Sequence, residues 1–183
     1  MRVNSGSARG RRLHSVPGDT TRPITDIVKQ ALFNILMDEA PGTRWLDLFG
    51  GTGAVGIEAL SRGAASCVFL DLAIAATRTI EKNLAETGLR DKAKVIRQDA
   101  LKFLAGRPNA QYDYIYVAPP QQRSLWSLAL AALDENPTWL ADDGTIVAQI
   151  APEEFVALDL KHLQLEDQRT YGRTMLCFYS KNS

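Results

Sequence analysis

A glycine-rich turn in the first third of the chain is the sharpest sign of a ligand site. Gly51, Gly53 and Gly56 have the spacing G-x-G-x-x-G, between an apolar run and a stretch of helical pattern. Glycines at these positions allow a tight strand-to-helix turn and let the backbone approach a ligand closely. The pattern is compatible with NAD, FAD or another nucleoside-containing ligand, or with a bare turn that binds nothing.

Three acidic residues narrow the choice of ligand. Asp47 stands four residues before Gly51, where a carboxylate suits a cationic amino-acid group and opposes a pyrophosphate. Asp71 stands twenty residues after Gly51, the distance at which a carboxylate accepts ribose hydroxyls. Asp99 could meet an adenine amino group, and simple helix capping is the alternative for both Asp71 and Asp99. Since these acids should meet at the carboxyl edge of one sheet, they favour S-adenosylmethionine.

A proline pair marks a candidate acceptor site. The apolar run at 112–117 leads into Ala118-Pro119-Pro120. Prolines fix the backbone and donate no N–H group, so the carbonyl of Ala118 is left rigid and free to accept a hydrogen bond. Such a carbonyl could orient an exocyclic amine toward a methyl donor. The alternative is that the proline pair simply ends a strand.

The elements that must position these residues alternate along the chain. A helix is expected from Thr25, as its cap, until Pro41-Gly42 stop it. Beyond it, alternating strands and helices predict a doubly wound α/β fold with a mostly parallel sheet, and the chain then ends in an antiparallel hairpin. We expect strands at 45–49, 67–71, 94–97, 114–117 and 145–150, helices at 54–61, 74–87, 100–104 and 126–133, and hairpin strands at 163–168 and 174–180.

Length and charge suggest one domain with a basic arm. The 183 residues fit a single domain, which we place at 24–183 behind an arm at 1–23. Residues 1–30 hold six basic and two acidic side chains, whereas the remainder holds 15 basic and 19 acidic ones. This asymmetry indicates a polyanionic partner contacted at one end, and a solvated, disordered tail is the alternative.

Several classes of protein are disfavoured by what the sequence holds. Cys67 and Cys177 lie far apart in apolar runs, so we interpret them as buried and reduced rather than as metal ligands or a disulfide. His14 and His162 are isolated, and we interpret both as surface residues. No secretory segment or membrane-spanning run is evident, so we expect a cytoplasmic protein with no membrane partner and no metal.

The chain resembles the bacterial small-subunit ribosomal RNA guanine-N2 methyltransferase family, the RsmD type. The resemblance covers almost the whole chain. It includes Gly6-Ser7-Ala8-Arg9-Gly10-Arg11-Arg12-Leu13, Arg22-Pro23-Ile24-Thr25-Asp26, Leu32-Phe33-Asn34-Ile35-Leu36, Leu46-Asp47-Leu48-Phe49-Gly50-Gly51-Thr52-Gly53 and Gly56-Ile57-Glu58-Ala59-Leu60-Ser61-Arg62-Gly63-Ala64.

The resemblance implies a Rossmann-like class I methyltransferase that modifies the N2 amine of a guanine in 16S ribosomal RNA. Its partner would be that RNA or the small ribosomal subunit, and we expect a monomer. The implied contacts with S-adenosylmethionine are at Asp47, Phe49, Gly51, Gly53, Asp71, Leu72, Asp99, Thr25 and Phe33. The implied RNA contacts are at Arg9, Arg11, Arg12 and Arg22, and the implied catalytic segment is Ala118, Pro119 and Pro120.

One departure from the family leaves the acceptor open. Amino-group methyltransferases of this class usually carry D/N-P-P-F/Y, but here Ala118 and Gln121 stand at the acidic and aromatic positions, and Ile24 replaces a more usual threonine. Gln122, Tyr116 or Trp126 could substitute. A DNA or small-amine methyltransferase, or an RNA-binding homologue with weakened catalysis, are the alternatives; an NAD-dependent dehydrogenase is opposed by Asp47.

Overall fold

The computed structural model describes residues 1–18, 23–120 and 124–183. Within these ranges seven strands form one sheet in the order β3-β2-β1-β4-β5-β7-β6. The strands are β1 Arg44–Asp47, β2 Ser66–Asp71, β3 Ala93–Arg97, β4 Tyr112–Val117, β5 Leu140–Ile150, β6 Leu163–Tyr171 and β7 Thr174–Lys181. Strands β1 to β5 are parallel, and β7 runs antiparallel to β5 and β6. The predicted doubly wound sheet ending in a hairpin is therefore confirmed.

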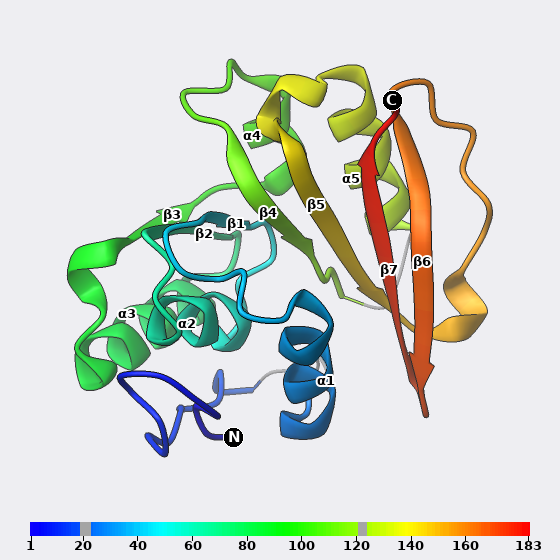
Figure 1. Ribbon diagram of the computed structural model, residues 1–183. Helices are drawn as coiled ribbons and strands as arrows, with labels where there is room; N and C mark the ends of the chain where they lie inside the picture. Colours follow the sequence, from blue (N-terminus) through cyan, green and yellow to red (C-terminus); the bar gives the residue numbers. More distant parts are fainter. Residues whose placement is uncertain (19–22, 121–123) are drawn as a thin grey trace.

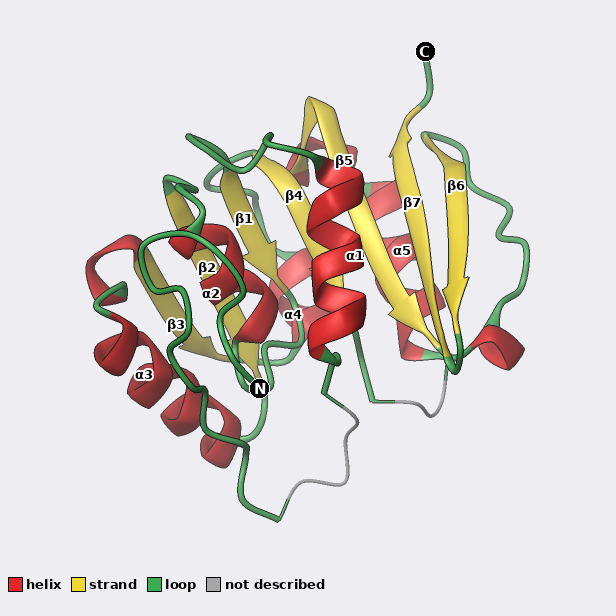
Figure 2. Cartoon of the chain, turned by 60° about the horizontal axis from the view of Figure 1, so that its bottom comes forward, coloured by secondary structure: helices red, strands yellow, loops and turns green. Residues whose placement is uncertain are grey.

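Helices cover both faces of this sheet (Figure 1). In the described ranges they are α1 Asp26–Leu36, α2 Ala54–Ser61, α3 Ile74–Thr87, α4 Ala100–Ala105 and α5 Leu125–Glu135, with short 3-10 turns at Arg90–Lys92, Pro137–Trp139 and Pro152–Glu154. Figure 2 shows α1, α2 and α3 in front of the sheet and α4 and α5 behind it. Each face has its own apolar core, as the burial of apolar runs on both sides of a parallel sheet requires.

Helix α1 begins as predicted but ends early. The side chain of Thr25 accepts a hydrogen bond from the backbone N–H of Val28 at 3.2 Å, which caps the helix. The helix ends at Leu36, because Met37 takes a positive φ of 54° before Pro41 is reached. Ile27, in the first turn of this helix, is an apolar residue that is 79% exposed.

Strand β5 is longer than its apolar run. The sequence predicted a strand from residue 145, whereas β5 begins at Leu140. The added residues 141–143 are partly or fully exposed, so they carry no apolar pattern. Leu140 pairs with Tyr112, and the register then shifts before Tyr114 pairs with Thr145. Backbone pairing at the sheet margin, which leaves little trace in side-chain type, therefore extends this strand.

The first 13 residues pack on α2. Val3, Ala8 and Leu13 are buried in the core of this face, and Arg2 and Arg12 form an antiparallel bridge. Gly6 has a φ of +88°, and a Cβ there would lie 1.8 Å from the carbonyl oxygen of Ser61. Residues 1–18 are thus not a solvated tail.

A buried carboxylate fastens this arm. Both oxygens of Glu58 accept backbone N–H groups, from Asn4 at 2.8 Å and Ser5 at 3.0 Å. The same side chain pairs with Lys29 at 3.1 Å and Arg62 at 2.9 Å, and neither Glu58 nor Lys29 is exposed. A buried acid is tolerated when it is paired and hydrogen-bonded in this way.

No helix in the described part of the chain is long and apolar enough to cross a bilayer.

Candidate active site

A cavity of about 470 Å³ opens at the carboxyl edge of the sheet, where the strand order reverses between β1 and β4. Ligands of open α/β sheets bind at such a reversal. The cavity brings together residues from the glycine turn, three strand ends, the start of α1 and the proline pair. Its lining includes ten of the residues singled out from the sequence, namely Thr25, Asp47, Phe49, Gly51, Asp71, Leu72, Asp99, Ala118, Pro119 and Pro120.

Asp47 is the most perturbed acid of the cavity. Its side chain is 2% exposed, and its Oδ1 has no hydrogen-bond partner within the described residues. Burial, followed by the negative charge of Asp71, raises the pKa of Asp47 to about 8, although a backbone hydrogen bond from Phe49 opposes the rise. A buried carboxyl oxygen without a donor fits a cationic ligand group that can donate to it. Asp47 is therefore a suitable hydrogen-bond acceptor for the amino group of S-adenosylmethionine.

The glycine turn wraps around Asp71. The N–H of Gly51 donates to Oδ2 of Asp71 at 3.0 Å, and the N–H of Ala73 donates to its Oδ1 at 2.9 Å. Gly51 has a φ of +57°, which few residues other than glycine adopt. Each Asp71 oxygen keeps a further lone pair, so the carboxylate can still accept hydroxyl groups from the cavity. Beside it Leu72 is 62% exposed and offers the cavity an apolar surface.

Asp99 caps a helix and lines the cavity at once. Its Oδ1 accepts a hydrogen bond from the N–H of Lys102 at 3.0 Å at the start of α4. The capping alternative is thus observed, and contact between Asp99 and an adenine stays a prediction.

The acceptor side holds Tyr116, which the sequence analysis named as a possible substitute, and Gln149, which it did not single out. The hydroxyl of Tyr116 donates to Oε1 of Gln149, and both side chains line the cavity beside Ala118. The signal for Gln149 was a lone polar residue near the end of the apolar run 145–150. Trp126 is 2% exposed and stacks with Phe155 away from the cavity, so it does not replace the missing aromatic. Gln121 and Gln122 lie outside the described residues.

Two of the predicted cofactor residues do not line the cavity. Phe33 is buried, with its ring 5.6 Å from that of Trp45 and 4.7 Å from the guanidinium carbon of Arg62. Its aromatic neighbours draw it into the core rather than over the cavity. Gly53 begins α2 with a φ of +81°, so it shapes the turn without contacting the cavity.

The arm adjoins the cavity. A second hollow of about 270 Å³ lies between the arm and the start of α1, and it shares Thr25 and Thr52 with the main cavity. Arg9, Arg11 and Arg12 are exposed on the arm, whereas Arg22 lies outside the described residues.

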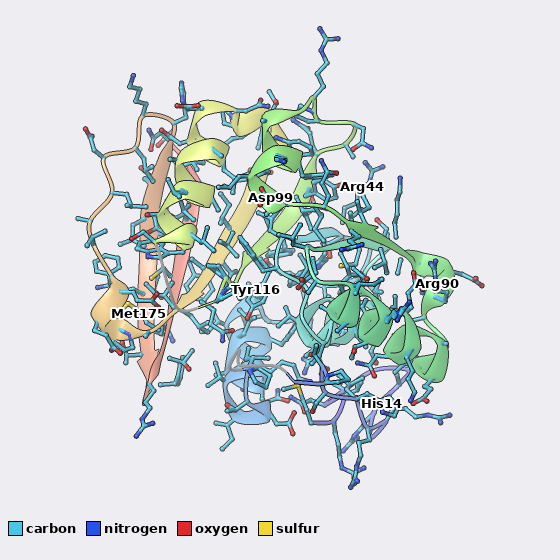
Figure 3. All side chains as sticks on the ribbon, turned by 180° about the vertical axis from the view of Figure 1, so that it is seen from behind. His14, Arg44, Arg90, Asp99, Tyr116 and Met175 are labelled. Atoms are coloured by element: carbon cyan, nitrogen blue, oxygen red, sulfur yellow. The ribbon has the colours of Figure 1, made fainter. Side chains whose placement is uncertain are left out.

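Asn83 of α3 ties the arm to the glycine turn. It is fully buried, and its Oδ1 accepts the N–H of His14 at 2.8 Å. Its Nδ2 donates to the carbonyl oxygens of His14 at 3.2 Å and Thr52 at 2.9 Å. Figure 3 places His14 on this arm, where its ring also contacts Glu86 at 2.6 Å.

The cysteines and the other potential metal ligands among the described residues form no second site. Cys67 and Cys177 are buried free thiols, and burial raises the pKa of both. In the part of the chain that the structure describes, no cluster of three or more His, Cys, Asp or Glu side chains could hold a metal ion.

The sheet order and the acid-lined cavity define a class I methyltransferase. Residues 1–180 match the family described as conserved hypothetical protein 95, and the chain belongs to this family, the RsmD family of methyltransferases.

Similar proteins span nearly the same length. The chain is 39% identical over 183 residues to the protein named putative rRNA methyltransferase YlbH from Bacillus subtilis, with 99% of each chain covered. It is 31% identical to ribosomal RNA small subunit methyltransferase D of Escherichia coli, with 100% of this chain and 91% of that protein covered. The solved structure described as putative methyltransferase yhhF from Escherichia coli has a TM-score of 0.87 at 32% identity, covering 99% and 97% of the two chains.

Proposed function

We propose that this chain transfers a methyl group from S-adenosylmethionine to the N2 amine of a guanine in small-subunit ribosomal RNA. The observation that carries the proposal is the single cavity that gathers the glycine turn, three acids and the Ala118-Pro119-Pro120 segment. Full-length relatives named for ribosomal RNA methylation support the substrate class.

The cofactor would be held by residues of three strand ends. Asp47 would accept hydrogen bonds from the amino group, while Phe49, Gly51 and the start of α1 at Thr25 surround the same volume. Asp71 would accept the ribose hydroxyls, and Leu72 and Asp99 would flank the adenine. S-adenosylmethionine, when bound, would supply an electrophilic methyl group on a positively charged sulfur. The amine nitrogen would form the new bond to this methyl group as the bond to sulfur breaks, its electron pair would stay on sulfur, and the amine would then release a proton to solvent.

The protein's own part is to bind the two reactants and to orient them. The carbonyl of Ala118, fixed by the prolines, would accept one hydrogen of the target amine and so aim its lone pair. Correct placement of two bound reactants would supply most of the rate.

The arm would supply the affinity for RNA. We propose residues 1–23 as the RNA-binding arm and residues 24–183 as the methyltransferase domain. Arg9, Arg11 and Arg12 are exposed on the arm, and other arm residues, Leu13 and His14, line the hollow that adjoins the active-site cavity. Contacts of these arginines with phosphates would be salt-sensitive and largely independent of sequence, and the shape of the RNA would then select the guanine.

The Ala118 departure favours one rival function, an RNA-binding protein with weakened catalysis. The test of both is transfer of radiolabelled methyl groups from S-adenosylmethionine to unmodified small ribosomal subunits, followed by mapping of the modified nucleotide. We expect incorporation at one guanine amine, with none into DNA or small amines. Cofactor binding without incorporation into any acceptor would support the rival, and incorporation only into DNA or small amines would change the substrate class.

A further inference from the structure

We infer that Gln149 supplies the side-chain acceptor for the target amine that Ala118 lacks, and that Tyr116 aims it. The inference rests on the proposed function, since the amine is the acceptor proposed above.

The sheet register brings Gln149 beside Ala118. Strands β4 and β5 pair in parallel, with Tyr116 opposite Val147 and Val117 opposite Ala148. One step further along the two strands, the register sets Ala118 opposite Gln149, where β4 has just ended. Partners in a parallel register point to the same face of the sheet, so Ala118 and Gln149 share the face covered by α1. Both line the same cavity.

An alanine at this position leaves room but no side-chain acceptor. The target amine has two hydrogens to place, and the carbonyl of Ala118 can accept one of them. The register of β4 and β5 brings the carboxamide of Gln149, on the neighbouring strand, beside the position that lacks a side-chain acceptor. Holding both hydrogens in the plane of the base would leave the nitrogen lone pair directed out of that plane, toward the methyl donor.

Tyr116 fixes the direction of this oxygen. Its side chain is 4% exposed, and its hydroxyl donates to Oε1 of Gln149. Burial, with a further contribution from the charge of Asp47, raises the pKa of Tyr116, so the hydroxyl keeps its proton and stays a donor. A carbonyl oxygen has two lone pairs, and the phenol occupies one, so the second is open to the amine. Tyr116 is therefore a positioning residue.

The role assigned to Gln149 involves no proton transfer. A neutral carboxamide accepts a hydrogen bond and neither gains nor loses a proton at ordinary pH. Its contribution is orientation, whereas a carboxylate at residue 118 would add a negative charge beside the amine. A carboxylate introduced at residue 118 should consequently restore what the loss of Gln149 removes.

The first test is binding, without turnover. The RNA or subunit in which the methylated guanine is mapped is prepared with guanosine or with inosine at that position, because inosine lacks the N2 amine. Affinity of each is measured with S-adenosylhomocysteine present. We expect wild type to prefer guanosine, and Gln149→Leu to show a clearly smaller preference, because only the carbonyl of Ala118 then accepts a hydrogen of the amine. Gln164→Leu, the same change on the exposed strand β6, should keep the preference.

The second test is single-turnover methyl transfer. We expect Gln149→Leu to slow the step by about 10- to 100-fold, the cost of leaving a buried donor unpaired, with unchanged affinity for S-adenosylhomocysteine. Gln149→Leu combined with Ala118→Asp should recover most of the rate. Tyr116→Phe should lower the rate of methyl transfer and leave the KM for the cofactor unchanged. This variant tests the pair of Tyr116 and Gln149 if Gln149→Leu does not fold.

The outcomes separate the two proposals. If wild type methylates no guanine, the proposed function fails and this inference fails with it. If wild type methylates guanine while Gln149→Leu keeps both the wild-type rate and the preference for guanosine, only the inference is overturned. If Gln149→Leu does not fold, a Tyr116→Phe variant with wild-type kinetics overturns it.

Discussion

Asp47 on β1 and Tyr116 on β4 are direct partners across the two strands, and both are almost fully buried at the cavity. Burial and the charge of Asp47 raise the pKa of Tyr116, and burial and the charge of Asp71 raise the pKa of Asp47. Without a bound cation, ionisation of these two side chains is therefore unfavourable. Binding of a cationic ligand should make ionisation of Asp47 easier, because a nearby positive charge favours the ionised carboxylate.

Replacing Asp47 with asparagine should raise the stability of the protein and lower its affinity for the cofactor. The folded-state pKa of about 8 lies above the ordinary value of 3.8, so ionising Asp47 costs folding free energy that grows as pH rises between those values. We expect Asp47→Asn to raise stability at pH 7 by about 2 kcal/mol and Tm by roughly 4–8 °C. The gain should vanish near pH 4, as paired thermal melts would show, and the affinity for S-adenosylmethionine should fall about a hundredfold.

The control for this change is Asp142→Asn on β5, because the side chain of Asp142 is 94% exposed. Asp142→Asn should leave both properties unchanged. A loss of stability in Asp47→Asn at pH 7 would contradict the assignment of Asp47 as a strained, ligand-seeking carboxyl.

Affinity for the cofactor should depend on pH through Asp47. Below pH 8 the ligand-free carboxyl is mostly protonated, so a cation that needs the carboxylate must displace a proton. Affinity should then rise roughly tenfold per pH unit from pH 6 and level off near pH 8. Isothermal titration with S-adenosylhomocysteine in buffers of different ionisation enthalpy would show the proton release. A flat profile in wild type, equal to that of Asp47→Asn, would argue against this coupling.

Gly6 should be needed for docking of the arm, whereas Gly10 should not. Both have positive φ values, of +88° and +85°, but a Cβ at Gly6 meets the backbone of α2 and a Cβ at Gly10 meets nothing within 4 Å. We expect Gly6→Ala to lower stability by about 3 kcal/mol and Gly10→Ala by about 1 kcal/mol. Denaturant melts and limited proteolysis of the arm would measure the difference. Equal losses of stability in the two variants would mean that the positive φ, and not contact with α2, causes the loss.

The arginines of the arm should set the salt dependence of RNA binding. Each phosphate contact that is lost should reduce the slope of log affinity against log salt by about 1. Arg9→Gln, Arg11→Gln and Arg12→Gln together should thus lower both affinity and slope, without changing cofactor binding. Lys94→Gln on β3 is the control for the loss of one exposed positive charge outside the arm, and it should leave the slope unchanged. An unchanged slope in the triple variant would place the RNA elsewhere.

Much of the fold could be predicted from local pattern, because the apolar runs of a parallel sheet and the glycines between them are visible in the sequence. The acids at strand ends followed from the same logic, since Asp47, Asp71 and Asp99 each come where a strand stops. Pairing between distant segments left no such trace. Lys29 and Glu58 form a buried ion pair across 29 residues of sequence, and nothing in either segment alone indicates it.

The site was harder to predict on its acceptor side. The family resemblance implied that Phe33, like Thr25, contacts the cofactor. Contacts with Trp45 and Arg62 instead determine where the ring of Phe33 lies. Gln149 is placed beside Ala118 only by the register of β4 and β5. Register depends on the whole sheet, so a single strand's sequence does not reveal its neighbour.

The bonds of Asn83 have a consequence for motion. All of its amide hydrogens are spent on the arm and the glycine turn, and the side chain is sealed from water. If one segment shifted alone, it would strand a buried polar group at a cost of about 1–3 kcal/mol. The arm at His14 and the glycine turn at Thr52 should therefore move together. Binding of RNA to the arm would consequently affect the conformation of the turn that binds the cofactor.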